Sequence, residues 1–414
     1  MLKPQKKTKK TALILIIGFI VLFAAIEIGI VLLDHFTKTA ANKNNYLFKD
    51  DMAVFGIKDS NGKLTYGIVD SDGKVILKAK YEAILPLGEE LFGIRETIED
   101  TKKFGIIDKN GAVVMECKYD AIKKYSGEYI AVCEDGKWGY ADCNGKWKIK
   151  PQYEDANNFS EGVAGVKKES KWSFIDKKGK QLSKETFQAT GSMQRGVSRV
   201  KKDGKWGYID VNFNWLIKPK YESAADFKEG YALVCKNGKW GFIDTNFKEV
   251  VPPKYKKAGS FKNGTACVMN FEGKWGFLDV ECKEFIKPQF AEVKNFSSSN
   301  RAPVKKDKNG LWGYINIDGK FEIKPQFKFA GVFESDYAPV SVNGKDFYYI
   351  NISGKNVLGE KTYSSITTYF EDDYALIQDD DKKWFAIDDG GSWVFSGKYD
   401  DIKSGNDTKW FIGK

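Results

Sequence analysis

The sequence predicts an all-β fold, a tandem array of about ten three-stranded antiparallel repeats, preceded by one transmembrane helix. Three observations support it. An aromatic residue followed by Gly, or by a residue in its place, recurs about every 34 residues, and such a period is typical of one supersecondary unit copied many times. Short β-prone segments separated by turn residues fill each period. A single long apolar run lies near the N-terminus.

Ten copies of the repeat align on the aromatic residue. The spacing is 34 residues from Phe104 to Trp240 and drifts toward both ends, where terminal repeats cap an array. Seven copies have Trp, which we interpret as the core anchor of each unit because a buried indole removes a large apolar area from water. A row of exposed Trp that stacks on sugars or bases is the alternative. These residues are Trp138, Trp172, Trp206, Trp240, Trp275, Trp312 and Trp384.

Residues 231–264 show what one unit contains. The apolar segment 231–235 predicts a strand, and Asn237-Gly238 predicts a type I′ hairpin turn into a second strand at 239–244. A third strand at 249–251 is expected to end at Pro252-Pro253, because proline cannot donate to a ladder. Each unit is then about three strands and an irregular return to the next unit.

Fixed offsets inside the units predict which residues pack together. In four copies an aromatic stands 15 residues after the repeat Trp, so we expect the two rings to be partners in one core; these aromatics are Tyr153, Tyr221, Phe290 and Phe327. The Gly beside each Trp indicates a bulge or a close backbone approach. Tyr66, Phe104 and Phe347 stand where Trp is expected, and Ser173, Tyr348 and Phe385 stand where Gly is expected. We expect those copies to pack differently.

The segment from Gly204 to Asp210, Gly-Lys-Trp-Gly-Tyr-Ile-Asp, followed by Ile217-Lys218-Pro219, resembles the WG-repeat (KWG-repeat) family of bacterial proteins. The resemblance covers roughly residues 50–414. It implies an all-β repeat fold and no common catalytic site, so it carries over no catalytic residue and no cofactor. We expect an open or superhelical array, because ten copies would make an unusually large ring; a closed, propeller-like ring is the alternative. Residues 408–412 look like the first strand of an eleventh unit, which pairs with the start of the array or caps its last edge.

The N-terminal region predicts a membrane anchor. Residues 12–33 are apolar except for Glu27, and about 22 residues suffice to cross a bilayer core of roughly 30 Å. Five lysines and no acid precede this segment, so the positive-inside rule keeps residues 1–11 in the cytoplasm. The signal anchor at 12–33 and a linker at 34–49 then place the repeat domain at 50–414 outside the cytoplasm. A cleaved signal peptide is the alternative, although its only small-residue candidate, Thr39-Ala40-Ala41, lies well beyond the apolar run.

The residues that carry chemistry give little support to catalysis. The single histidine, His35, follows the membrane segment, so the repeat domain has no histidine for a catalytic triad or a metal site. An Asp recurs four residues after the aromatic and just before a turn, where it is expected to bond its own turn backbone; paired carboxylates for glycoside hydrolysis are the alternative. These are Asp142, Asp176, Asp210, Asp244 and Asp279.

Six cysteines would lie outside the membrane, where disulfides can form. No Cys-x-x-Cys pair indicates a metal or redox site, and Cys133 and Cys235 replace ordinary strand residues five positions before a repeat Trp. We therefore interpret the cysteines as free, mostly buried thiols. One bridge between Cys133 and Cys143 across a hairpin is the alternative.

The charge pattern suggests the class of partner. The net charge is +10, and a Lys precedes the repeat aromatic in five successive copies; a row of such residues attracts anionic wall polymers or lipid headgroups, or is simply a soluble surface. These are Lys137, Lys171, Lys205, Lys239 and Lys274. Nucleic acid is not an expected partner outside the cell. The sequence therefore predicts a non-enzymatic, membrane-anchored, extracytoplasmic binding scaffold for a protein or an envelope polymer; the alternatives are an envelope enzyme acting on glycans and a structural spacer.

Overall fold

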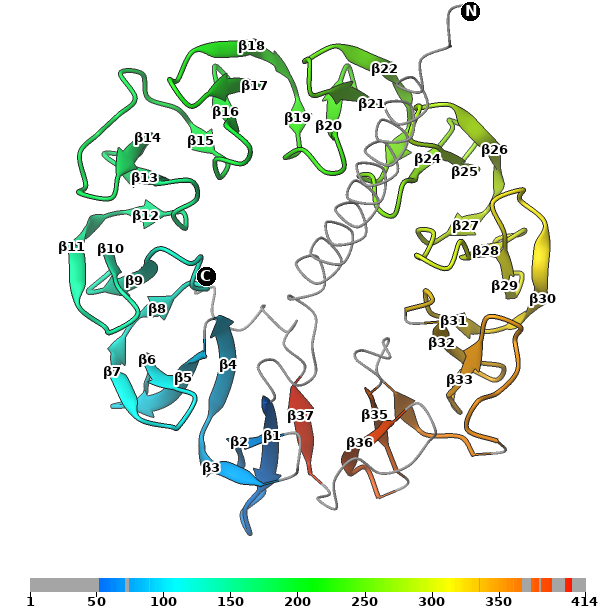
Figure 1. The fold of residues 1–414 in the computed structure, drawn as a ribbon, viewed down its shortest axis with the longest axis horizontal. Helices are drawn as coiled ribbons and strands as arrows, with labels where there is room; N and C mark the ends of the chain where they lie inside the picture. The colour runs from blue at the N-terminus through cyan, green and yellow to red at the C-terminus, as the bar shows by residue number, and fades with distance from the viewer. Residues whose placement is uncertain are drawn as a thin grey trace, which may run out of the picture.

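The computed structural model describes residues 52–70, 74–88, 90–334, 336–359, 361–366, 374–379, 381–388 and 399–403. Throughout these residues the chain is all-β, and ten small antiparallel sheets follow one another around a ring (Figure 1). The predicted cytoplasmic segment, transmembrane helix and linker all lie outside the described residues. Within the described part of the chain, no helix is long and apolar enough to cross a bilayer.

Seven of the sheets have four strands and three have three. The four-stranded sheets are β37 (Asp401–Lys403) with β1 (Met52–Lys58), β2 (Leu64–Asp70) and β3 (Val75–Tyr81); β4 (Ala83–Gly88), β5 (Leu91–Ile98), β6 (Thr101–Asp108) and β7 (Val113–Tyr119); β8 (Ala121–Ile122), β9 (Ile130–Glu134), β10 (Lys137–Ala141) and β11 (Trp147–Tyr153); β15 (Ala189–Thr190), β16 (Val197–Lys202), β17 (Lys205–Asp210) and β18 (Trp215–Tyr221); β19 (Ser223–Ala224), β20 (Tyr231–Lys236), β21 (Lys239–Asp244) and β22 (Glu249–Tyr255); β23 (Lys257–Ala258), β24 (Ala266–Met269), β25 (Trp275–Leu278) and β26 (Glu284–Phe290); and β27 (Glu292–Val293), β28 (Ala302–Lys305), β29 (Trp312–Ile315) and β30 (Phe321–Phe327). The three-stranded sheets are β12 (Asp155–Ala156), β13 (Val163–Lys168) and β14 (Lys171–Asp176); β31 (Phe329–Ala330), β32 (Tyr337–Ser341) and β33 (Tyr348–Asn351); and β34 (Ser365–Ile366), β35 (Tyr374–Gln378) and β36 (Trp384–Asp388).

The sheet formed by β19, β20, β21 and β22 shows how one unit is built. Its central hairpin turns at Asn237 and Gly238, whose φ angles of 52° and 69° are the positive values that a type I′ turn requires, as predicted. The return between units is more regular than expected, because its residues 223–224 form the short strand β19, which pairs with β20. Each full sheet therefore has four strands rather than three.

The outermost strand β22 does not end at the prolines, so that prediction is wrong. Trp240 and Phe242 are two residues apart on β21, whereas their partners Tyr255 and Val251 are four apart on β22. The strand therefore bulges outward at Pro252 and continues to Tyr255. Proline is tolerated there because an edge strand at a bulge needs no donated hydrogen bond at that position.

The bulge explains the Gly of each repeat. At every repeat Gly of the four-stranded sheets, an added Cβ would lie 2.3–2.7 Å from a carbonyl oxygen of the bulged outer strand, closer than real side chains approach. These residues are Gly67, Gly105, Gly139, Gly207, Gly241, Gly276 and Gly313. The three-stranded sheets are the ones with Ser173, Tyr348 or Phe385 at this position, and isolated bridges such as Trp172 with Phe187 replace their outer strand. Those three copies do pack differently, as predicted. The copies of Tyr66 and Phe104, for which the same was expected, instead form ordinary four-stranded sheets with the same bulge, so that part of the prediction is wrong.

The apolar cores lie between neighbouring sheets. One core joins Tyr140 and Ile149 of one sheet to Ala164 and Ile175 of the next, with Phe159 between them. The aromatic two residues after the repeat Trp, or after Phe347 in its place, is almost fully buried in seven units; these residues are Tyr140, Phe174, Tyr208, Phe242, Phe277, Tyr314 and Tyr349. The core therefore fills the space between units and not the interior of a single unit.

The repeat Trp lies at the edge of these cores. Trp138, Trp206 and Trp240 are partly buried and pack against a core, whereas Trp312 is buried, with 8% of its surface exposed. The predicted partnership with the second aromatic is confirmed, because Trp240 stands directly opposite Tyr255 across the two outer strands. The other such pairs are Trp138 with Tyr153, Trp206 with Tyr221, Trp275 with Phe290 and Trp312 with Phe327.

Tyrosine hydroxyls also link several of the sheets to the next one. The hydroxyl of Tyr208 donates to the carbonyl of Ala225 at 2.8 Å. The hydroxyl of Tyr221 donates to Glu249 of the following sheet at 2.8 Å, and burial together with this hydrogen bond raises the pKa of Tyr221. Hydrogen bonds from Lys220 and Tyr221 lower the pKa of Glu249. The sheets are therefore fixed by directional bonds as well as by apolar contact.

The array closes on itself, so the expectation of an open or superhelical array is wrong. Strand β37, from near the C-terminus, pairs with β1, and the residue pairs include Gly56 with Asp401 (Figure 1). The backbone amide of Lys58 donates to the carboxylate of Asp400 at 2.7 Å. Pairing the two ends of the array in one sheet removes the open edges that an unclosed array would have. Residues 408–412, expected to form a pairing strand, lie outside the described residues.

Replacing Gly241 with Ala should destabilise the protein by about 1–3 kcal/mol, because the new Cβ would overlap the carbonyl of Val251. Urea unfolding would measure the change. Ser173→Ala is the matched control, since that unit already accommodates a side chain and has no bulged fourth strand. Equal stability of the Gly241→Ala variant and the wild type would contradict the close-approach explanation.

Candidate functional site

The ring has two distinct faces defined by its turns. Tyr231 pairs with Asp244, so the turn that leads into β20 and the turn that leaves β21 lie at the same end of the sheet. The hairpin at 237–238 lies at the opposite end. We call these ends, repeated around the ring, the turn face and the hairpin face.

The repeated Asp residues organise one set of turns on the turn face. The carboxylate of Asp244 accepts hydrogen bonds from the backbone amides of Asn246 and Lys248, both at 2.9 Å. Asp142, Asp176, Asp210 and Asp279 repeat this geometry in their own units. The predicted bond from each Asp to its own turn is confirmed, and it accounts for the presence of Asp at this position.

A second set of turns lies on the same face. Lys228 and Tyr231 exchange two backbone hydrogen bonds at 2.8 and 3.0 Å, with Glu229 and Gly230 between them at φ angles of 49° and 87°. This is a tight two-residue turn in which both central residues have positive φ. The equivalent turns of the neighbouring units have Arg195-Gly196 and Asn263-Gly264 at their centres.

Carboxylates connect these inner turns from one unit to the next. The two oxygens of Glu161 accept hydrogen bonds from the amides of Arg195 and Gly196, at 2.5 and 2.9 Å. Glu229 likewise accepts hydrogen bonds from the amides of Asn263 and Gly264, at 2.8 and 2.9 Å. In both cases the Glu precedes the turn it caps by one repeat. Two adjacent backbone N–H groups in such a turn form a small anion-binding concavity.

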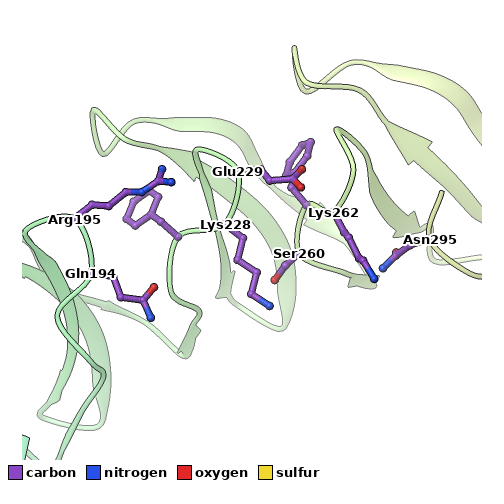
Figure 2. A pocket seen from close by; sticks show the side chains of 9 residues that line it. Gln194, Arg195, Lys228, Glu229, Ser260, Lys262 and Asn295 are labelled. Atoms are coloured by element: carbon purple, nitrogen blue, oxygen red, sulfur yellow. The ribbon is translucent and has the colours of Figure 1, made fainter. Parts of the chain in front are cut away.

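A groove of about 720 Å³ crosses the inner turns of four consecutive sheets. Figure 2 shows Gln194 and Arg195 at one side, Lys262 and Asn295 at the other, and Lys228 with Glu229 between them. The lining residues are Gln194, Arg195, Phe227, Lys228, Glu229, Ser260, Phe261, Lys262 and Asn295. Three cations and one carboxylate thus face a single concavity, and that carboxylate is already bonded to turn amides.

The lysines predicted to form a row lie on the hairpin face, away from this groove. Lys137, Lys171, Lys205 and Lys239 are exposed and Lys274 is half-buried. Lys205 lies 3.6 Å from Glu222, which also caps the hairpin amides of Asn237 and Gly238. The predicted lysine row is therefore present on the hairpin face, but the carboxylate of Glu222 on the same face partly neutralises its positive charge.

The repeat indoles are partly covered by cations of the chain itself. The ammonium of Lys123 lies 4.6 Å from the ring centre of Trp138, and the guanidinium of Arg199 lies 4.9 Å from that of Trp206. Arg199 also bonds Asp226 of the next sheet at 2.8 Å. These contacts occupy ring faces that a stacking ligand would need.

The cysteines of the described chain are free thiols, including Cys133 and Cys143. Burial raises the pKa of Cys117 to about 12 and that of Cys133 to about 11. Within the described residues, no group of three or more His, Cys, Asp or Glu side chains is arranged to hold a metal ion.

The groove cations were not singled out from the sequence. Arg195, Lys228 and Lys262 occur in a short return segment whose residues differ between units, so no repeated motif marks them. One signal was present, because Arg195 stands one repeat after Glu161 and one repeat before Glu229. This spacing becomes informative only in the structure, where the side chain at this position reaches the turn amides of the next unit.

Repeated four-stranded sheets, buried aromatics between them and Gly under each bulge define a β-repeat ring protein. The chain belongs to the WG containing repeat family, whose repeat matches residues 66–96, 104–138, 138–172, 172–206, 206–240, 240–275, 275–309 and 312–345. The copies centred on Phe347 and Trp384 follow the last matched repeat. No curated protein sequence matches the chain.

Several solved structures are similar in shape. One, described as the eukaryotic initiation factor, shares 11% identity at a TM-score of 0.49 and covers 85% of this chain and 97% of its own. BamB from Moraxella catarrhalis shares 12% identity at a TM-score of 0.33, covering 63% of this chain and 94% of its own. The dihydro-heme d1 dehydrogenase NirN shares 13% identity at a TM-score of 0.36, covering 85% of this chain and 74% of its own.

Thiol labelling at pH 8 should separate the cysteines by burial. Exposed Cys143 should react quickly with a disulfide reagent, whereas Cys133, at a pKa of about 11, should react far more slowly because only about one thiol in 1,000 is ionised. A Cys143→Ser variant should lose the fast phase, and guanidinium should expose all six thiols. Equally fast labelling of Cys133 and Cys143 in the native protein would contradict this burial pattern.

Proposed function

We propose that this protein is a membrane-anchored, extracytoplasmic binding scaffold whose repeat surface engages a protein or an envelope polymer. One observation carries the proposal. The inner turns keep the same backbone geometry from unit to unit but present different side chains, including Gln194 and Arg195, Lys228 and Glu229, and Lys262 and Asn263. A constant frame with variable turns and a groove across them is how repeat proteins build binding surfaces.

The N-terminal sequence supports the anchor and its orientation. The apolar run at 12–33 has the length of a membrane span, and the lysines before it favour a cytoplasmic N-terminus. In this arrangement the ring lies outside the cytoplasm, connected by the short linker at 34–49. Nucleic acid would then be absent from its surroundings, and no cofactor is required for its role.

The hydrogen bonding of the repeated Asp residues favours a scaffold over a glycan-cleaving enzyme. The Asp244 carboxylate accepts bonds from two turn amides, which fixes the turn and suits a structural role. An enzyme would instead need two carboxylates facing one substrate bond at a defined separation. A structural spacer would have no use for a cationic groove.

Fusion reporters at the C-terminus test the topology. Alkaline phosphatase fused after Lys414 should be active, and a green fluorescent protein fused there should be dark when exported by the Sec route, because the anchor places the ring outside the cytoplasm. Replacing Lys3, Lys6, Lys7, Lys9 and Lys10 with Gln should weaken this orientation. Strong cytoplasmic fluorescence with an inactive phosphatase would refute the extracytoplasmic placement.

Cosedimentation with cell-envelope sacculi tests the scaffold itself. The full-length protein in detergent should bind saturably at low salt and lose binding at high salt, because exposed charges are screened. The Asp244→Ala variant is the control for an enzyme, and it should keep binding while losing roughly 1–3 kcal/mol of stability. No saturable binding would refute a polymer partner, and turnover of sacculi abolished in a folded Asp244→Ala variant would favour the enzyme.

A further inference from the structure

On the turn face, one inner turn without a carboxylate cap lies between two inner turns that each have one. Glu161 caps the amides of residues 195 and 196, and Glu229 caps those of residues 263 and 264. The residue that should cap the amides of Glu229 and Gly230 is Arg195, which stands one repeat earlier. Among the described residues, no side chain accepts a hydrogen bond from those two amides. This turn therefore has the same anion-binding concavity as its neighbours without their internal anion.

The surroundings of this turn favour an external anion. The turn lies in the groove, where Arg195 extends toward it in place of the capping Glu (Figure 2). Lys228 precedes the two amides directly, and Lys262 lines the same groove. A Cβ built on Gly230 would meet no atom within 4 Å, so the space beside the turn is open. Two aligned N–H groups and adjacent cations are the usual elements of an anion site.

We propose that the turn at Glu229-Gly230 and the side chains of Arg195 and Lys228 form a binding site for a carboxylate borne by a peptide. The two neighbouring turns indicate the ligand group, because each of them is filled by a Glu carboxylate whose two oxygens each accept one amide. The guanidinium of Arg195 adds a planar donor pair that suits a carboxylate.

Other groove residues favour a peptide as the carrier. The amide side chains of Gln194 and Asn295 and the hydroxyl of Ser260 can donate to and accept from a peptide backbone. Half-buried Phe227 provides an apolar surface beside them. The proposal rests on the binding scaffold proposed above and specifies its ligand group and its site. The carboxylate can come from an acidic side chain or from a peptide C-terminus.

Arg195→Glu is the decisive variant because it restores the missing cap. The new carboxylate should bond the amides of residues 229 and 230, as Glu161 does one unit earlier, and occupy the site from within. Binding of fluorescent poly-L-glutamate to the full-length protein should weaken about tenfold or more. Hydrogen exchange of the 229 and 230 amides should slow, and thermal unfolding should show that the variant is folded.

Two further variants separate the site from general charge effects. Lys171→Glu makes the same change of charge on the hairpin face and should alter binding less than about twofold, because the site is remote and the surface is screened. Arg195→Gln removes the cation but leaves the amides open, so it should bind more weakly than wild type and more tightly than Arg195→Glu. A poly-L-glutamate with an amidated C-terminus distinguishes the two sources of carboxylate. Binding should be lost if the site takes the peptide C-terminus and kept if it takes an acidic side chain.

Several outcomes would overturn the proposal. Wild-type affinity of the Arg195→Glu variant for poly-L-glutamate would show that this turn is not the binding site. An equal loss of affinity in the Lys171→Glu variant would show the same. Inorganic polyphosphate serves as a competitor at equal charge. If it bound more tightly than poly-L-glutamate, with the same sensitivity to Arg195→Glu, the ligand group would be a phosphate and not a carboxylate. Sacculus binding without any poly-L-glutamate binding would refute the carboxylate site and leave the scaffold intact. Poly-L-glutamate binding that depends on Arg195, without sacculus binding, would refute only the wall-polymer form of the scaffold.

Discussion

The packing of each unit's central aromatic between two neighbouring sheets is the contact on which the rest of the structure depends. Tyr208 is 1% exposed, lies in a core shared with the next unit and donates its hydroxyl to the carbonyl of Ala225 there. The apolar residues of one described unit are buried partly against the unit before it and partly against the unit after it, so the cores are shared between units. Stability therefore belongs to the array, and closing the ring gives the first and last units the neighbours that they would otherwise lack.

This arrangement separates the residues that fix the fold from those that vary. The buried aromatics, the Gly under each bulge and the Asp of each outer turn repeat because every unit meets the same geometric demand. The second position of each inner turn is less constrained, because the backbone hydrogen bonds of the turn form whatever side chain stands there. Chemistry can therefore change there at little cost in stability. Arg195 stands where the neighbouring units have a capping Glu, and this change leaves the amides of the turn at Glu229-Gly230 open to a carboxylate from outside the chain.

Ring closure uses the same interactions as the rest of the array, but on a smaller scale. The short strand β37 completes the sheet of β1, the hydroxyl of Tyr66 donates to Asp401 at 2.8 Å, and Tyr399 packs on Phe55 with ring centres 4.6 Å apart. The N-terminal and C-terminal ends of the repeat domain therefore meet in one sheet. Separation of these ends would expose the core that Phe55 shares with Tyr399 and Leu376.

The sequence by itself determined the all-β class, the period, the hairpin at Asn237-Gly238, the Asp turns and, in four units, the pairing of Trp with the second aromatic. These features rest on interactions inside one unit, within about 15 residues, and local patterns record them. Only the tertiary structure decided that the array closes, that β22 passes through its prolines and that the deepest aromatic is Phe242, two residues beyond the Trp. It also decided the groove, because Arg195, Lys228 and Lys262 come from different units and meet only when the sheets stand side by side. Closure and the groove depend on contacts between whole units that are far apart in the sequence, and no local pattern encodes such contacts.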